Sequence, residues 1–201
     1  KKASLLASIA QHEGFSLEQT IAAYEDALNL LSQAVARETA GLESLRRFCD
    51  PSSKKLLDGL VADFKLTEIN HRGRIEEWYL SLGGKKAPSE MGEREKALAT
   101  KVPGNLGSPG DYMRHKAEIE GPKSLHGTMA WEALNFVDGK RSILDIYRAV
   151  RAQSLSAGEW YYGKVTLEDV EALFTAAEKE KAVEITVKPL EKPTGQPCST
   201  D

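Results

Sequence analysis

The first half of the chain carries three polar side chains at positions where a helical apolar seam should face inward. Between residues 17 and 45, apolar residues recur at alternating steps of four and three, and Glu38 takes one of these positions. A second seam, between residues 57 and 82, is interrupted by Glu68 and His71. Because carboxylate and imidazole ligands suit iron or manganese, these residues are candidates for a metal site that supports oxidation chemistry.

The Glu-x-x-His spacing of Glu68 and His71, with the single Glu38 on the other stretch, resembles the metal motif of ferritin-like di-iron proteins. That resemblance implies bound iron, an oxidoreductase activity and a second copy of the chain that completes the site. The competing interpretation is that these residues are polar breaks in partly exposed helices. Antiparallel pairing about residue 50 places Glu68 beside Leu31 and Glu38 near Ala62, so the three side chains would not meet within one chain.

Two helices of about 30 residues each must position these side chains. Ser16 and Gln19 have the spacing of a capping box at the start of the first helix. Asp50-Pro51 restarts the chain with an N-cap and a proline at the first helical position. So short a connection predicts an antiparallel helical hairpin over residues 1–84, which begins with a short apolar-rich segment over 3–12.

Residues 85–124 are interrupted by proline and glycine, which predicts a linker with partial order and one short helix around Glu90–Ala99. Asp111 and His115 have an i, i+4 spacing that could hold a metal, but their surroundings favour a solvated loop.

Residues 125–188 predict a small winged-helix-like α+β domain, which makes the whole chain mainly α. A first helix carries Trp131, and two more helices begin at the capping residues Ser142 and Thr166. Alternating apolar residues over 183–188 then predict a half-buried strand. Residues 189–201 contain three prolines and predict a disordered tail.

The stretch AWEALNFVDGKRSILDIYRAV, residues 130–150, followed by Val165–Val170, resembles a known module. It is similar to the winged-helix-like domain that follows the catalytic domain in some bacterial zinc aminopeptidases of the transferrin-receptor-like family. The layout also resembles PqqD-type peptide-binding modules. The first resemblance implies a non-catalytic, accessory C-terminal region of such a metallopeptidase, acting in assembly, partner contact or substrate gating.

That family's zinc ligands and catalytic glutamate lie in its catalytic domain, and no residue of this sequence matches them. The resemblance therefore implies no catalytic residue and no cofactor here, with a parent catalytic domain or another protein as partner and a homo-oligomer as a further possibility. It also implies an exported or periplasmic location; without it, a cytoplasmic one is expected. The chain opens at Lys1 without a methionine, so we expect processing or a longer parent protein.

Two groups of residues are candidates for partner contact. Trp160, Tyr161 and Tyr162 form an aromatic run in a glycine-flanked loop, and amphipathic rings in a loop favour interfaces. The same run could instead close the core of the small domain. Lys140 and Arg141, at the Asp-Gly turn, form a smaller basic group that suits a partner contact or a solvated helix face.

Composition and charge narrow the function classes further. The 201 residues carry a net charge of −3, which gives no basic field for nucleic acid. The helix expected to enter a DNA groove, residues 167–181, is rich in Glu and Asp, so phosphates would be repelled. No apolar run approaches the roughly 20 residues that a membrane-spanning helix needs.

The two interpretations differ in metal content. The ferritin-like interpretation predicts about one iron per two chains after purification from iron-supplemented medium, and loss of that iron in Glu68→Ala. The accessory-region interpretation predicts no metal in either protein. Elemental analysis of the two proteins distinguishes them, and iron in the wild type that Glu68→Ala loses would contradict the accessory-region interpretation.

Overall fold

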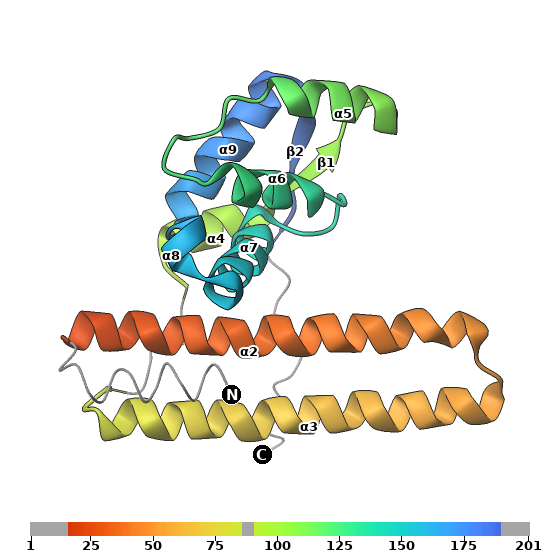
Figure 1. Cartoon of the computed structure of the whole chain (residues 1–201), viewed down its shortest axis with the longest axis vertical. Coiled ribbons are helices and arrows are strands. Elements are labelled where there is room, and N and C mark those ends of the chain that lie inside the picture. The colour runs from red at the N-terminus through yellow and green to blue at the C-terminus, as the bar shows by residue number, and fades with distance from the viewer. Residues whose placement is uncertain (1–15, 86–90, 190–201) are drawn as a thin grey trace, which may run out of the picture. The chain divides into compact units, whose positions relative to one another are not determined.

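The computed structural model describes residues 16–85 and 91–189. The predictions for residues 3–12 and for the tail after residue 189 lie outside the described residues. The chain divides into two compact units, Lys1–Pro88 and Ser89–Asp201, and each is described by itself. The described residues are mainly helical, as predicted, with a small two-stranded antiparallel sheet (Figure 1).

The first unit contains two long α-helices joined by a 3₁₀ turn: α2 (Leu17–Leu45), η1 (Arg46–Phe48) and α3 (Pro51–Ser81). The second unit contains shorter helices and the two strands, in this order: α4 (Glu93–Thr100), β1 (Lys101–Asn105), α5 (Pro109–Glu118), α6 (Gly127–Asn135), α7 (Ile143–Ala157), α8 (Glu159–Tyr162), α9 (Leu167–Lys179) and β2 (Val183–Val187).

The caps predicted for the long helices are confirmed. The Ser16 hydroxyl accepts from the Gln19 amide at 3.3 Å while the Gln19 side chain accepts from the Ser16 amide at 2.8 Å. The Asp50 carboxylate caps α3, and proline follows it. The two helices lie side by side, and the rings of Tyr24 and Tyr79 stack with centroids 4.3 Å apart (Figure 1). The start of α2 therefore lies level with the end of α3.

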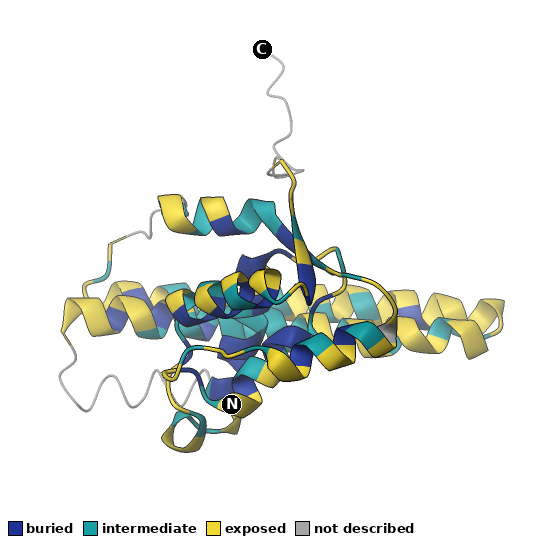
Figure 2. Cartoon of the chain, turned by 90° about the horizontal axis from the view of Figure 1, so that it is seen from above, coloured by how far each residue is buried: buried dark blue, intermediate teal, exposed yellow. Residues whose placement is uncertain are grey.

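The α2–α3 pair buries few side chains. In α3 only Leu57 and Tyr79 are buried, and exposed residues cover much of both long helices (Figure 2). Leu66 and Ile69 remain 57% and 66% exposed. Because two helices pack along a single seam, a second apolar face on either helix stays exposed to solvent.

The core of the second unit lies along one face of α9. Val170, Leu173 and Phe174 are at most 1% exposed, and their neighbours in the core come from α6, α7 and β2. The Thr166 hydroxyl caps this helix by accepting from the Asp169 amide at 3.1 Å. Ser142 and Asp145 cap α7 with a complete capping box, as their spacing predicts.

Residues 91–118, part of the predicted linker, form α4, β1 and α5. The helix expected at Glu90–Ala99 occurs at Glu93–Thr100. The segment that holds Asp111 and His115 is helical rather than a loop, because Ser108 and Asp111 form a capping box and Pro109 occupies the first turn. Proline and glycine here mark helix starts and a strand as well as loops.

Strand β1 is the partner of the predicted strand β2, and the two run antiparallel from Lys101 opposite Val187 to Asn105 opposite Val183. Pro103 lies within β1, which a strand with a free edge tolerates. In β2 the predicted alternation fades along the strand: Val183 is buried, Ile185 is half-buried and Val187 is 72% exposed.

Truncation of the Leu98 side chain in α4 tests whether the segment predicted as a linker contributes to the core. Leu98 is fully buried, so Leu98→Ala should lower the free energy of unfolding by about 2–5 kcal/mol, because it leaves a cavity. Leu66→Ala, on the exposed face of α3, should change it by no more than about 0.5 kcal/mol. Urea denaturation measures both, and equal effects would contradict the assignment of α4 to the core.

Candidate functional site

Within one chain, Glu38 lies apart from Glu68 and His71. Glu68 accepts a hydrogen bond from the Ser32 hydroxyl at 2.9 Å and lies 3.6 Å from the Arg72 guanidinium. This bond agrees with the expected register, in which Glu68 faces Leu31. Glu38 lies six positions after Ser32, hence roughly 9 Å farther along the α2 axis.

Glu38 and His71 are both exposed. Glu38 pairs with its neighbour Arg37 at 3.3 Å. Within the described parts of the chain, no three His, Cys, Asp or Glu side chains lie close enough to hold a metal ion. A site made from these three residues would need ligands from a second chain.

The aromatic run forms a short helix, α8, between two glycines that adopt positive φ angles. Trp160 is 87% exposed and Tyr161 is 59% exposed. Their ring centroids are 5.7 Å apart, and the ring of Tyr161 meets that of Tyr162 edge-on at 4.8 Å. Trp160 and Tyr161 therefore lie at the surface, whereas Tyr162 is half-buried and packs against the core, as the alternative interpretation of this run expects in part.

His126, the N-cap residue of α6, completes this cluster. Its ring lies 5.6 Å from Tyr161 and 5.3 Å from Tyr162. Its Nδ1 accepts from the Thr128 amide at 3.2 Å, which leaves Nε2 available as a donor in the neutral ring. We call His126, Trp160, Tyr161 and Tyr162 the aromatic platform. The sequence did not indicate His126, because it approaches the other rings only through the fold.

Buried polar contacts hold the aromatic platform in place. Arg151 of α7 is buried, and its guanidinium pairs with the Glu159 carboxylate at the start of α8. The Ser154 hydroxyl donates to the Gly163 carbonyl at 2.8 Å at the other end. A loop fixed at both ends presents its rings with little loss of conformational entropy on binding, and rings with polar edges suit a protein contact.

Lys140 and Arg141 lie at the turn before α7, away from the aromatic platform. Their amides donate to the Asp138 carboxylate at 2.9 and 2.8 Å. Burial alone would raise the pKa of Asp138, but these two hydrogen bonds and the nearby cations hold it below its ordinary value. Because α7 has 15 residues, the turn and the aromatic platform are separated by roughly 22 Å of helix. They are two separate surfaces.

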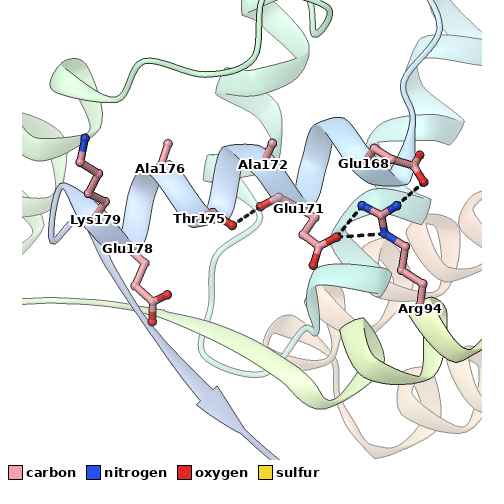
Figure 3. A pocket seen from close by; sticks show the side chains of 8 residues that line it. All are labelled: Arg94, Glu168, Glu171, Ala172, Thr175, Ala176, Glu178 and Lys179. Atoms are coloured by element: carbon pink, nitrogen blue, oxygen red, sulfur yellow. Dashed lines mark hydrogen bonds and ion pairs between the residues drawn. The ribbon is translucent and has the colours of Figure 1, made fainter.

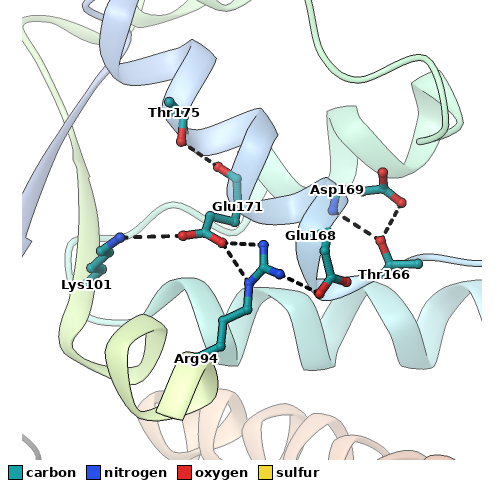
Figure 4. A network of polar contacts seen from close by, with 7 residues as sticks. All are labelled: Arg94, Lys101, Thr166, Glu168, Asp169, Glu171 and Thr175. Atoms are coloured by element: carbon teal, nitrogen blue, oxygen red, sulfur yellow. Dashed lines mark hydrogen bonds and ion pairs between the residues drawn. The ribbon is translucent and has the colours of Figure 1, made fainter. Parts of the chain in front are cut away.

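A shallow groove of about 830 Å³ runs along the outer face of α9, lined by Arg94 and by residues from Glu168 to Lys179 (Figure 3). Arg94 donates to Glu171 at 2.7 and 3.0 Å and to Glu168 at 2.7 Å, and Lys101 lies 3.6 Å from Glu171 (Figure 4). These cations and carboxylates compensate one another. The network therefore fastens α4 and β1 to α9 and offers no unbalanced charge to a ligand.

Lys116 of α5 is a buried cation that the sequence did not indicate. Its ammonium lies 3.7 Å from the centroid of the Trp131 ring and donates to the Asn135 side chain at 2.5 Å. Burial lowers its pKa, while the charge of Glu132 opposes that shift. Its position depends on α5, which was not predicted as a helix.

No family model, curated protein or solved structure matches the chain. Among the described residues, none of the helices has both the length and the apolar character that crossing a bilayer requires.

Gly158→Ala tests how strictly the backbone shapes the aromatic platform. Gly158 has φ +124°, and a Cβ atom there would collide with the indole nitrogen of Trp160. We expect the substitution to displace Trp160, changing its fluorescence emission, and to cost about 1 kcal/mol or more of stability.

Gly127→Ala, at the first position of α6, is the matched control, because a Cβ there would meet no atom within 4 Å. It should leave the emission and the melting temperature unchanged. The same small effect from both substitutions would contradict the strained geometry assigned to Gly158.

Proposed function

We propose that the chain is a non-catalytic accessory region of a zinc aminopeptidase-like metallopeptidase, and that the aromatic platform contacts the parent catalytic domain or another protein. The observation that carries the proposal is the exposure of Trp160 and Tyr161 on a loop held by buried contacts. Exposed, pre-ordered aromatic side chains are typical of the central residues of protein interfaces. Assembly, partner contact and substrate gating are the roles that such a surface serves.

The first unit supports the same proposal. We infer that α2 and α3 act as an antiparallel helical hairpin whose outer face is covered by another protein body. Leu66, Ile69 and Leu80 of α3 are 45–66% exposed, and all three lie on the side away from the α2 seam by helical spacing. Exposed apolar residues on a single helix face mark an interaction surface.

The second unit supports the resemblance to the aminopeptidase module. We infer that α6, α7 and α9, with the β1–β2 ladder, make up a winged-helix-like arrangement in which residues 130–150 supply the first two of these helices. The acidic face of α9, with Glu168 and Glu171, disfavours nucleic acid as the partner. An exported or periplasmic location follows if the parent is such a peptidase.

Iron binding at Glu38, Glu68 and His71 stays a separate prediction. It needs a homo-oligomer, since only a second chain can bring another Glu38 close to Glu68 and His71. The described residues offer no observation that favours it over the hydrogen bond between Ser32 and Glu68, which already gives that carboxylate a structural role.

The gene provides the first test of the accessory function. The reading frame that encodes this chain should also encode a zinc aminopeptidase catalytic domain on its N-terminal side. That domain, produced separately, should bind the 201-residue chain in isothermal titration calorimetry. The double variant Trp160→Ala, Tyr161→Ala should weaken this binding about tenfold or more, because it removes the central rings of the contact.

Lys179→Ala is the control, since that side chain is 83% exposed on α9 and lies outside the aromatic platform. It should bind as the wild type does. A reading frame without a peptidase domain would overturn the proposed function. Unchanged affinity in the double variant would remove the aromatic platform from the contact.

A further inference from the structure

A second groove in the Ser89–Asp201 unit, of about 430 Å³, has the composition of a small-ligand site. Ile119 and Pro122, which follow α5, line it together with Ala130 of α6 and Leu173 of α9. Two cationic residues, Lys116 and Lys123, and Trp131 also line it. The volume lies in the range of small-molecule sites, and the lining combines apolar with polar groups.

Lys116 is the unusual member of this lining. The residue is only 3% exposed, and its ammonium lies over the Trp131 ring, with the Tyr112 ring 5.7 Å away. Its hydrogen-bond partner is the neutral Asn135 side chain. Within the described residues, no carboxylate oxygen lies within the 4.0 Å of an ion pair with it.

A buried ammonium without a carboxylate partner is costly, and buried charges in proteins are normally paired. Contact with the Trp131 ring offsets part of that cost. A methionine would fill the same volume beside the ring without any charge, so packing alone does not account for the lysine. Burial lowers the pKa of Lys116, and the charge of Glu132 opposes that shift without cancelling it.

The missing partner is therefore an anion that the apolar lining also accepts. Trp131 is 43% exposed and forms one wall, so a ligand in the groove would lie against it and near the ammonium that Lys116 holds over its ring. We propose that this groove binds a small monocarboxylate with an apolar tail, the carboxylate pairing with Lys116 and the tail lying on Ile119, Pro122 and Leu173. Lys123 adds a second positive charge at the groove. This inference does not depend on the proposed aminopeptidase function.

The test uses octanoate as the probe and octylamine as its matched control, since the two share a tail and differ in the sign of their charge. Octanoate should produce a saturable shift of the Trp131 indole N–H signal in NMR spectra of the ¹⁵N-labelled full chain. Trp131→Phe assigns that signal among the three tryptophans of the chain. Octylamine should leave the signal in place, and the signal of the exposed Trp160, which does not line the groove, should not move.

Lys116→Met should weaken octanoate binding about tenfold or more, because it removes a charge-assisted hydrogen bond. Lys164→Met, an exposed lysine outside the groove, should bind octanoate as the wild type does. Circular dichroism checks that both variants fold.

Three results would overturn the proposal: no saturable shift of Trp131, an equal shift with octylamine, or unchanged affinity in folded Lys116→Met. If Lys116→Met fails to fold, the comparison of octanoate with octylamine on the wild-type chain is sufficient to test whether the groove binds a carboxylate.

Discussion

The second unit depends on the burial of one face of α9. Phe174 and Val170 are fully buried there, and α6, α7 and β2 pack around that face. This packing sets the direction of α7, whose C-terminal end carries the aromatic platform. It also brings Leu173 to the groove that Lys116 lines. The aromatic platform and the groove therefore both depend on the same apolar contact.

In the first unit, the small number of helices limits how many side chains can be buried. Two helices of 29 and 31 residues share one seam, which cannot surround an apolar core. The stacked rings of Tyr24 and Tyr79 and the hydrogen bond from Ser32 to Glu68 set the alignment of the pair. They leave Leu66 and Ile69 facing outward. The contact with another protein that we propose would cover these apolar side chains.

Local signals predicted much of the secondary structure. Ser16 with Gln19 and Ser142 with Asp145 formed the capping boxes that their spacing indicates, because a cap needs only residues three positions apart.

The features that the sequence did not predict involve long-range contacts. β1 was not predicted, since Pro103 and Gly104 indicate a turn until β2 pairs with them. Glu38 and His71 are exposed although the seam pattern placed them inward, because a pair of helices buries few side chains. His126 and Lys116 gained their neighbours only through tertiary packing.

The β1–β2 ladder also constrains the order in which the second unit can form. It joins Lys101 to Val187, so its two strands enclose the helices from α5 to α9 in sequence. Contacts between such distant residues carry a large loop-closure entropy and slow folding. During synthesis the helices from α4 to α9 leave the ribosome first, and β1 waits without a partner until residues 183–187 emerge. Pairing with β2, the last of the described elements, thus joins the residues of this segment that are made first and last.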